Sequence, residues 1–379
     1  MGVCMSQTQN YGGYTSNGEV NKSMFVFKYA IGTGSFGTVW KVEKKPSRFP
    51  LAIKVMNKAK IYNLRSVDTV INEMKLLGTL KHPFIVNMNY AFSEKEYLYL
   101  VTDLMVGGDL KYHLKRRRRK FTERQSQFII ACIVLGLEYL HVNGVLHRDI
   151  RPENILIDGK GYCKLADFGL ARIWQPLNSS DTSGAPGYVA PEVLNRQNHG
   201  TGVDYFAVGI IAHELMLGKK PWQGKDRQSY KDDLMKTQVV LKKADTPESW
   251  NHEASDFINK CILRKPNSRL GLNGPSEIKS HVWFKDFDWQ ALLARKITSP
   301  FIPSIKAKNF SKAALIANLD DNSQDNPVLM KMNRELLADP SFQALFNDYK
   351  YDVDEEKRRE QEREELEKRK RNNQELRQL

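Results

Sequence analysis

The sequence predicts an α+β protein with two lobes, in which a β-rich lobe precedes a mainly helical one. Between Phe25 and Val55, short runs of β-branched and aromatic residues are broken by Gly and Pro clusters, which is typical of strands and hairpins. Later segments place apolar residues at three- and four-residue spacings, which indicates helices. These segments cover residues 66–80, 122–143, 202–218 and 251–264. At 379 residues the chain exceeds one domain of about 100 to 200 residues, so we expect two packed lobes with extensions.

Composition limits the class of protein. A hydrophobic content of 41% with 10% aromatic residues is ordinary for a globular protein, and no stretch approaches the roughly 20 apolar residues of a membrane span. The four cysteines are widely spaced without a disulfide or zinc pattern, which favours a reducing, cytoplasmic compartment. The net charge of +14 suits an anionic partner, whether lipid headgroups, nucleotide phosphates or nucleic acid.

A glycine-rich segment lies between two predicted strands. Glycines at these spacings let the backbone approach triphosphate oxygens and donate N–H groups to them, and a valine can cover an adenine face. Its position between strands, rather than ahead of a helix, excludes the usual dinucleotide-binding interpretation; a merely flexible hairpin is the alternative. The candidate nucleotide contacts are Ile31, Gly32, Thr33, Gly34, Ser35, Phe36, Gly37 and Val39.

A lysine and a glutamate are spaced to form a buried ion pair. Lys54 follows Ala52 and Ile53 on the next predicted strand, and Glu73 lies 73 − 54 = 19 residues later on the first helical segment. A carboxylate would hold the ammonium group toward the α- and β-phosphate oxygens. Taken alone, Lys54 has an ordinary surface lysine as its alternative interpretation.

The strongest signal is the segment His-Arg-Asp-Ile-Arg-Pro-Glu-Asn at residues 147–154, followed by Asp-Phe-Gly at 167–169. Asp149 supplies a carboxylate for a substrate hydroxyl, and Asn154 supplies an amide oxygen for a metal ion. Asp167 adds the main metal ligand. Because Mg²⁺ prefers few protein oxygens together with phosphate oxygens, this sparse set predicts Mg²⁺, with Mn²⁺ as an alternative.

With these motifs in order, the sequence resembles the eukaryotic protein kinases over residues 25–284. Ala-Pro-Glu at 190–192, Asp204 ahead of Gly209, and Arg269 complete the set. Within the kinases, the AGC group is favoured, and the chain most resembles its YANK-type branch. The segments that favour the AGC group are residues 107–110, 268–271, 281–284 and 300–303.

The resemblance implies a serine/threonine kinase with a bilobal fold: a β-rich N-lobe with one main helix, a mainly helical C-lobe, and ATP in the cleft. Such an enzyme transfers the γ-phosphoryl group of Mg-ATP to Ser or Thr hydroxyls of proteins. The resemblance also implies that Glu192 pairs with Arg269 and that Asp204 braces the catalytic loop. Further implied contacts of the ATP site are Ala52, the gatekeeper Thr102, the hinge residues Asp103 and Met105, and Asp109 and Glu153.

The resemblance, together with the composition of the two ends of the chain, predicts domain boundaries. A flexible arm covers residues 1–24, and the kinase domain covers 25–284, with an N-lobe of about 25–103 and a C-lobe of about 104–284. An AGC-type extension covers 285–353, and a charged helical tail covers 354–379. In the extension, Phe342, Phe346 and Tyr349 resemble the hydrophobic motif by which AGC kinases dock their tail on the N-lobe. In the tail, Glu and Lys or Arg at four-residue spacing favour a solvated single helix, whereas the leucines form no heptads.

Two positions depart from the kinase pattern. The catalytic-loop lysine is replaced by Arg151, and the small hydroxyl residue that usually contacts it is replaced by Ala185. Arginine keeps a positive charge near the γ-phosphate, but it is longer and forked. We therefore count Arg151 with Asp149 and Lys54 as catalytic, and keep a membrane-tethered pseudokinase or adaptor as the alternative function.

The activating phosphosite of the family corresponds to Asp181, which is flanked by Ser and Thr residues. A built-in carboxylate facing Arg148 would partly replace phosphate and give basal activity without an upstream kinase, although one charge imitates a phosphate poorly. A solvated acidic loop residue is the alternative interpretation.

The N-terminus predicts attachment to a membrane. Met-Gly-Val-Cys-Met-Ser satisfies the N-myristoylation pattern at Gly2, and Cys4 would supply palmitate as the second signal that one myristoyl chain needs. The basic run at 115–120 is either a lipid patch or a solvated helix end. We expect a peripheral membrane protein of the cytoplasm, monomeric, with no specific nucleic acid as partner because no aromatic residues interleave these charges.

The predicted partners are protein substrates. Asp109 and Glu153 match positions at which related kinases hold basic residues upstream of the phosphorylated Ser or Thr. This predicts a preference for basic substrates, and purely local structural roles for the two carboxylates are the alternative.

Overall fold

The computed structural model describes residues 19–116, 120–304, 309 and 327–376 of the chain. These belong to two compact units. Of the described residues, 19–74, 88–104 and 327–376 belong to the first unit, and 75–87, 105–116, 120–304 and 309 belong to the second. The predicted lipid sites Gly2 and Cys4, and the centre of the basic run at 117–119, lie outside the described residues.

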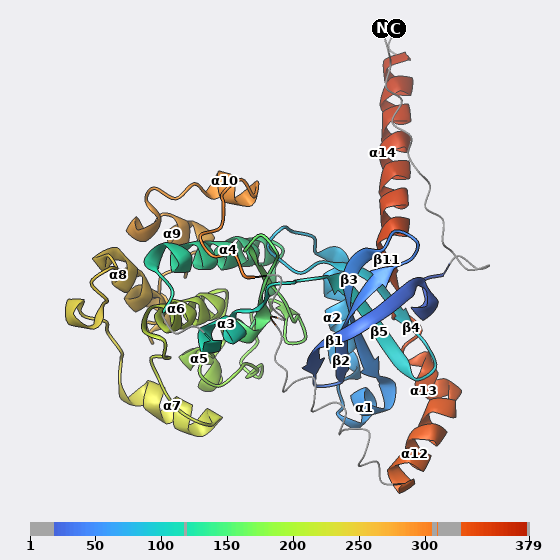
Figure 1. Cartoon of the computed structure of the whole chain (residues 1–379), viewed down its shortest axis with the longest axis horizontal. Coiled ribbons are helices and arrows are strands. Elements are labelled where there is room, and N and C mark those ends of the chain that lie inside the picture. Colours follow the sequence, from blue (N-terminus) through green and yellow to red (C-terminus); the bar gives the residue numbers. More distant parts are fainter. Residues whose placement is uncertain (1–18, 117–119, 305–308, 310–326, 377–379) are drawn as a thin grey trace. The chain divides into compact units, whose positions relative to one another are not determined.

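The first unit is built on a six-stranded antiparallel sheet with the strand order β1-β2-β3-β5-β4-β11 (Figure 1). Side chains alternate between the faces of each strand, so Val42, Ile53 and Val101 reach one core and are fully buried there. The strands are β1 (Phe25–Gly34), β2 (Gly37–Lys44), β3 (Phe49–Asn57), β4 (Met88–Ser93), β5 (Tyr97–Asp103) and β11 (Tyr351–Asp352).

The C-terminal extension completes this first unit. Its strand β11 pairs with β4 at the edge of the sheet, and α14 runs on directly from β11 (Figure 1). Phe342, Phe346 and Tyr349, which the sequence likens to a docking motif, are at most 3% exposed and lie within this unit. The helices are α1 (Lys58–Asn63), α2 (Val67–Thr79, in this unit as far as Met74), α12 (Pro327–Ala338), α13 (Pro340–Ala344) and α14 (Val353–Leu376).

The second unit is mainly helical and packs around α4 and α6. A capping box between Thr122 and Gln125 starts α4. By length and composition alone α4 could cross a membrane, but 67% of its apolar window is buried inside the protein, as in a core helix. The helices are α3 (Leu110–Arg116), α4 (Glu123–Val142), α5 (Pro191–Leu194), α6 (Gly202–Leu217), α7 (Arg227–Lys236), α8 (His252–Cys261), α9 (Pro275–Lys279) and α10 (Trp289–Leu293).

Two small sheets and several short turns complete the second unit. One sheet has the order β6-β8-β9 and the other pairs β10 with β7. Their strands are β6 (Gly108–Asp109), β7 (Val145–Leu146), β8 (Ile155–Ile157), β9 (Cys163–Leu165) and β10 (Arg172–Ile173). The 3₁₀ turns of the described residues are η1 (Lys22–Met24), η2 (Pro152–Asn154), η3 (Lys243–Asp245), η4 (Pro266–Ser268) and η5 (Val282–Phe284).

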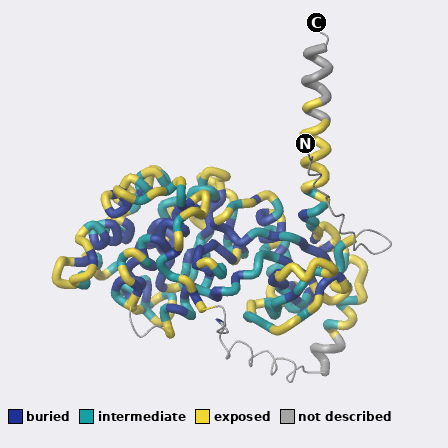
Figure 2. Tube along the Cα trace, turned by 45° about the horizontal axis from the view of Figure 1, so that its top comes forward, coloured by how far each residue is buried: buried dark blue, intermediate teal, exposed yellow. Residues whose placement is uncertain are grey.

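The predicted α+β class is confirmed, and the four predicted helical segments match α2, α4, α6 and α8 to within about three residues at each end. The described side chains of α14 are mostly exposed, in contrast to the buried α4 and α6 (Figure 2). The predicted solvated helix is therefore present as far as Leu376. The described cysteines Cys132, Cys163 and Cys261 are buried and free.

Candidate active site

The predicted Lys54–Glu73 pair is present in the first unit. Strand β3 carries Lys54, whose Nζ lies 3.1 Å from Oε2 and 3.4 Å from Oε1 of Glu73 on α2. Glu73 is only 4% exposed. A carboxylate so buried is stable only when it is paired, so the helix and the strand hold the ammonium group in a defined place.

The glycine segment forms the tip of the β1–β2 hairpin. Gly34 pairs with Gly37 across a two-residue turn made by Ser35 and Phe36. At Gly37 a Cβ would lie 1.9 Å from the carbonyl oxygen of Val55 on β3, so this glycine is required by sheet packing. At Gly34 the nearest side-chain atom to a Cβ would be Cε of Lys54, at 3.8 Å. The hairpin tip and the candidate catalytic lysine are therefore neighbours.

The remaining predicted residues of this segment sit on the two strands that flank the turn. Register places Val39 opposite Lys54, Ala52 opposite Thr102, and Thr33 opposite Thr38. Ile31 and Gly32 precede the turn on β1. Asp103 ends β5, and Met105 is the first residue of the longer segment, 105–312, of the second unit.

In the second unit, the catalytic loop is fixed around Asp149. Asn154 donates through Nδ2 to the Asp149 carboxylate oxygen Oδ2 at 2.7 Å and to its carbonyl oxygen at 2.9 Å. Burial raises the pKa of the Asp149 carboxyl above its ordinary value, and the negative charge of Asp167 adds to the rise. The two hydrogen bonds from Asn154 therefore fix the orientation of the Asp149 carboxylate. Its raised pKa makes this carboxylate a stronger base than an exposed aspartate.

Asp204, on α6, holds the same loop through hydrogen bonds to its backbone. Its two carboxylate oxygens accept the backbone N–H groups of His147 at 3.0 Å and of Arg148 at 2.8 Å, and His141 contacts it through Nε2 at 2.9 Å. These bonds keep the pKa of the Asp204 carboxyl below its ordinary value although the group is fully buried. The role implied for Asp204, bracing the catalytic loop, is thus present in the geometry.

Asp167 presents an exposed carboxylate just after β9. Its backbone lies in the left-handed region with φ 63°, and Oδ1 accepts the N–H of Gly169 at 3.3 Å. Phe168, the next residue, is buried against the ring of His147, with centroids 5.1 Å apart. The turn thereby separates a packing residue from a candidate ligand.

The donor chemistry fits a hard divalent cation. The Nδ2 group of Asn154 is used by Asp149, which leaves the amide oxygen Oδ1 for a ligand, and Asp167 offers a carboxylate oxygen. Among the described residues no group of three or more His, Cys, Asp or Glu side chains is placed to enclose a metal ion. A cation there would need further oxygens from a phosphate or from water.

Asp181 faces Arg148, as the sequence suggests. Arg148 Nη1 lies 2.8 Å from Asp181 Oδ2; the arginine side chain is 5% exposed and the aspartate side chain 46%. Arg148 Nε donates to the carbonyl oxygen of Leu170 at 2.8 Å. The same loop is held by Arg227, which donates to the carbonyl oxygens of Thr182 and Gly184.

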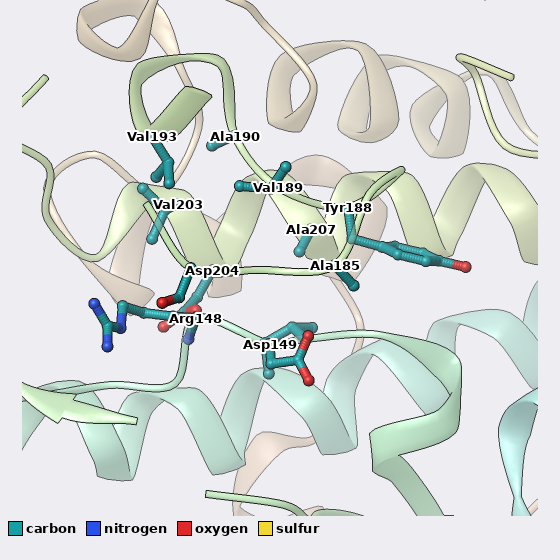
Figure 3. A pocket seen from close by; sticks show the side chains of 12 residues that line it. Arg148, Asp149, Ala185, Tyr188, Val189, Ala190, Val193, Val203, Asp204 and Ala207 are labelled. Atoms are coloured by element: carbon teal, nitrogen blue, oxygen red, sulfur yellow. The ribbon is translucent and has the colours of Figure 1, made fainter. Parts of the chain in front are cut away.

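Ala185 and Arg151, the two departures from the kinase pattern, have different surroundings in the structure. Ala185 lines a pocket together with Asp149 and Tyr188 (Figure 3). Arg151 instead donates through Nε to Glu153 Oε2 at 3.0 Å, and this bond raises the pKa of the guanidinium. Glu153 is therefore an ion-pair partner of Arg151.

The pairing of Glu192 with Arg269 that the resemblance implies is present, and Asp109 has a local contact. Arg269 forms a bidentate pair with Glu192, with distances of 2.5 and 2.9 Å, and both residues are at most 4% exposed. Asp109 Oδ1 accepts the N–H of Tyr112 at 2.7 Å at the start of α3, and burial raises its pKa.

Sequence reasoning missed two cations and one carboxylate beside this site. Lys111 on α3 lies 3.2 Å from Oε1 of Glu214 on α6, and Tyr188 donates to Oε2 of the same carboxylate at 2.6 Å. The Nζ atom of Lys220 lies 5.2 Å from the centre of the Tyr188 ring. Since 103 residues separate Lys111 from Glu214, no local spacing signals this contact.

Comparison with known proteins identifies the family. The protein kinase domain matches residues 25–284, more than two thirds of the chain. The chain belongs to the protein kinase family. Members of this family use ATP and a divalent metal ion, and the curated relatives of this kinase place it in the AGC group of serine/threonine kinases. The likeness to the YANK-type branch stays a prediction.

Three relatives illustrate the likeness. A Dictyostelium discoideum protein named "probable serine/threonine-protein kinase" is 38% identical over 316 residues, covering 82% of this chain and 68% of the relative. A RAC family serine/threonine-protein kinase homolog of the same organism is 33% identical, covering 86% of this chain and 71% of the relative. The Dictyostelium discoideum cAMP-dependent protein kinase catalytic subunit is 34% identical, covering 73% of this chain and 42% of the relative.

Proposed function

We propose that this kinase transfers the γ-phosphoryl group of ATP to Ser or Thr hydroxyls of proteins with Asp149 as the residue that receives the hydroxyl proton. The observation that carries the proposal is the fixed direction of the Asp149 carboxylate, which Asn154 bonds at 2.7 Å, together with its raised pKa. A carboxylate held in one orientation places the attacking oxygen, and a raised pKa improves its action as a base.

Lys54 supplies positive charge to the phosphates. Its ammonium is held by Glu73 and adjoins Gly34 at the hairpin tip, where backbone N–H groups can also face phosphate oxygens. Charge placed in advance on the transferring group needs no rearrangement during the reaction. Arg151 would add a second cation, although its bond to Glu153 must loosen for its guanidinium to reach a phosphate.

Asn154 and Asp167 would hold the divalent metal ion, for which Mg²⁺ is the proposed species and Mn²⁺ the substitute. Their hard oxygen donors favour either ion over softer metals. When bound, such an ion neutralises phosphate charge and polarises the phosphoryl oxygens. The protein contributes the direction of the two ligands: Asn154 is fixed by Asp149, and Asp167 by the turn at Gly169.

The transfer activity is tested by comparing the intact chain with Asp149→Asn and with the exposed control Asp232→Asn on α7. We expect Asp149→Asn to lower radiolabel transfer to a Ser peptide by about 10³-fold, within the usual range for loss of a general base. Thermal stabilisation by Mg-ATP should persist, and Asp232→Asn should match the wild type. Stabilisation by Mg-ATP without transfer by the wild type would support the adaptor alternative and sink the proposal.

We also propose that Asp181 supports basal activity in place of a phosphate. Its carboxylate lies 2.8 Å from the guanidinium of Arg148, whose neighbour Asp149 is the proposed base. Removing the charge with Asp181→Asn should lower the activity of phosphatase-treated enzyme by about tenfold, whereas Asp181→Glu should keep most of it. Near-total loss of wild-type activity after phosphatase treatment would instead indicate phosphorylation of Thr182 or Ser183.

Attachment to the cytoplasmic face of a membrane is a further proposal, which the sequence at Gly2 and Cys4 supports. Two acyl chains together give stable anchoring, whereas one gives only marginal binding. Myristate labelling of the wild type but not of Gly2→Ala, followed by sedimentation with anionic vesicles, tests it. Equal sedimentation of both proteins would contradict the role of the lipid. The expected monomeric state is checked by light scattering on the same samples.

A further inference from the structure

The turn between β2 and β3 in the first unit carries cations and an exposed aromatic ring, and we call residues 44–50 the basic turn. Its sequence is Lys-Lys-Pro-Ser-Arg-Phe-Pro, with three cations and no carboxylate. Residues 45–50 are all exposed, and Phe49 is 61% exposed. A single exposed hydrophobic side chain is ordinary on a protein surface. The position of this ring among cations is what points to a partner.

Hydrogen bonds within the basic turn fix its shape. Arg48 donates its backbone N–H to the carbonyl oxygen of Lys44 at 2.8 Å, and Ser47 Oγ donates to the same oxygen at 3.3 Å. Ser47 Oγ also accepts the N–H of Phe49 at 3.3 Å. The backbone of Arg48 lies in the left-handed region with φ 57°, which favours glycine. Backbone conformation therefore does not explain an arginine here, and the turn presents the side chains of Arg48 and Phe49 to solvent from a defined backbone.

Two cations of the basic turn have no ion-pair partner among the described residues. Lys44 Nζ lies 2.7 Å from Asp354 Oδ2, so its charge is balanced by α14. Lys45 Nζ donates instead to the carbonyl oxygen of Ser23 at 3.0 Å. Within the described part of the chain, neither Lys45 nor Arg48 has a carboxylate at ion-pair distance. A partner with negative charge is therefore attracted to both cations without displacing an internal carboxylate.

The basic turn lies beside the first described residues of the chain. The N–H of Lys45 donates to the carbonyl oxygen of Met24 at 2.8 Å, next to the contact with Ser23. Lys22 is exposed and adds a third cation, while Glu94 borders this end and accepts the N–H of Lys22 at 3.3 Å. Three cations and one carboxylate leave this surface positive.

We propose that the basic turn binds the surface of a bilayer that contains anionic lipids, with Lys45 and Arg48 at the headgroups and Phe49 at the apolar boundary. Attraction of basic residues to an anionic leaflet adds to the burial of an apolar side chain in its boundary. The exposed ring favours a bilayer over a soluble anion, because only a bilayer offers an apolar layer beneath its charges.

This inference rests on the proposed membrane attachment and names the surface of the folded domain that takes part in it. Gly2 lies 19 − 2 = 17 residues before Glu19, the first described residue. At most about 60 Å of chain therefore joins the proposed acyl site to the end of the sheet that carries the basic turn. Acyl chains at that distance would raise the local concentration of lipid at the turn, so two weak contacts would act together.

The test uses the full chain with Gly2→Ala and Cys4→Ser, which removes both proposed acyl sites. It is sedimented with phosphatidylcholine vesicles that contain about one third phosphatidylserine, and with phosphatidylcholine alone. We expect weak binding to the anionic vesicles, little to the neutral ones, and loss of binding at high salt. Absence of binding to the anionic vesicles, or equal binding to both kinds, would overturn the proposal.

Variants assign the binding to the basic turn. Arg48→Gly, which suits the left-handed backbone, should lower the vesicle partition coefficient about fivefold, and Phe49→Ser should lower it by a similar factor. The matched control is Leu64→Ser with Arg65→Gly, in the same unit: Leu64 is 54% exposed and Arg65 has φ 51°. It removes the same kinds of group and should bind like the parent chain. Equal losses in the control and in the turn variants would refute the assignment.

Two competing surfaces and partners are tested in the same assay. Lys115→Ser with Arg116→Ser reduces the basic run of the second unit and should leave vesicle binding within about twofold. Loss of binding in this variant, with none in Arg48→Gly, would place the lipid contact there and overturn the proposal. Binding of a DNA oligonucleotide that Arg48→Gly abolishes, without binding to vesicles, would assign the basic turn to nucleic acid and also overturn it.

A fluorescent probe measures whether the tip of the turn enters the bilayer. The described cysteines are buried, so Phe49→Cys in the chain with Gly2→Ala and Cys4→Ser can be labelled selectively. We expect the emission of an environment-sensitive label to shift to shorter wavelength with anionic vesicles, and the same label at Leu64→Cys to show no shift. Unchanged emission at position 49 would contradict insertion.

The acylated wild type separates this inference from the membrane attachment on which it rests. If it sediments with vesicles while Arg48→Gly and Phe49→Ser change neither acylated nor unacylated binding, the attachment stands and the role of the basic turn fails. If the acylated wild type does not sediment at all, the attachment fails and this inference with it. Phosphoryl transfer to a soluble peptide should be equal in all these proteins, which shows that the variants are folded.

Discussion

Two lysines four residues apart in the first unit have opposite environments. Lys54, on β3, is paired with the carboxylate of Glu73 at 3.1 Å and its side chain is 21% exposed. Lys58, at the start of α1, is 2% exposed and meets no carboxylate within the described residues. Its Nζ instead donates to Oε1 of Gln343 at 2.7 Å and lies 5.1 Å from the centre of the Phe346 ring, both in the C-terminal extension.

The difference shows that the partner decides what a lysine can do. A carboxylate stabilises the charged ammonium and keeps it available for an anionic ligand. An amide oxygen and an aromatic ring fix the position of an ammonium group without neutralising it, and burial lowers the pKa of Lys58 to about 8. Lys54 is thus suited to catalysis, and Lys58 to holding the tail on the sheet.

The largest expected effect is on activity, at Lys54. We expect Lys54→Met to lower kcat/KM by about 10³-fold, because a positive charge placed on the phosphates is lost. Stability should fall as well, since Glu73 is left buried without its partner. The double variant Lys54→Met with Glu73→Gln should regain the thermal stability but not the activity.

A second ion pair of the same unit provides the control. Lys28 Nζ lies 3.0 Å from Glu43 Oε2, with side chains 37% and 25% exposed. Lys28→Met should leave kcat/KM unchanged and shift stability by less than about 1 kcal/mol. If it reduced activity as much as Lys54→Met does, the functional distinction between the paired lysines would be lost.

The next largest effect is expected on stability, at Phe346, whose ring contacts the Lys58 ammonium. Phe346 is fully buried in the first unit, so Phe346→Ala should reduce the stability of the docked tail by about 3 kcal/mol, through lost burial and a cavity. Hydrogen exchange should then quicken at β11 and at the β4 edge that it covers. Leu345→Ala, at a side chain 46% exposed, should change exchange very little. Equal protection in both variants would mean that the tail is held without Phe346.

The same two lysines show how far the sequence predicts this molecule. Lys54 was predictable because its strand, its partner 19 residues on and the glycine segment form a local pattern of known chemistry. Lys58 was not, because its partner Gln343 is 285 residues away and a lysine followed by Ala and Lys carries no sign of burial. Phe346 was recognised only through its resemblance to a docking motif.

In the second unit, too, some contacts follow from local sequence patterns and others join residues far apart in the sequence. The Asp149–Asn154 contact follows from spacing on one loop, and the Asp204 brace follows from the family pattern. The occupation of Glu214 by Lys111 and Tyr188 depends on where α3, α6 and the loop before α5 meet, which no local pattern encodes. Local chemistry was thus predictable, whereas charge compensation across elements required the structure.

A smaller effect depends on pH and tests the buried lysine directly. The pKa of Lys58 in the folded state, about 8, lies below its value of 10.5 in the unfolded chain. Between these pH values the unfolded state binds more protons than the folded state, so the free energy of unfolding rises with pH. Below this range Lys58 is charged in the folded state, and its burial lowers the free energy of unfolding. Relative to Lys58→Met, the wild type should gain about 2 °C in Tm between pH 7.5 and 9.5. If Tm changed with pH in the same way for both proteins, Lys58 would have an ordinary pKa. Its environment would then not differ from that of Lys54 as described.

The smallest effect is expected where charges are plentiful and exposed. Glu355 and Arg359 form an i,i+4 pair on α14, with side chains 51% and 58% exposed. Both remain hydrated, so Glu355→Gln should change stability by no more than about 0.5 kcal/mol, and even this difference should vanish at high salt. Circular dichroism of thermal unfolding at two salt concentrations measures it. A loss of stability as large as that of Phe346→Ala would contradict this expectation. It would show that Glu355 is buried in a contact with another surface, because one hydrated ion pair on an exposed helix contributes far less to stability.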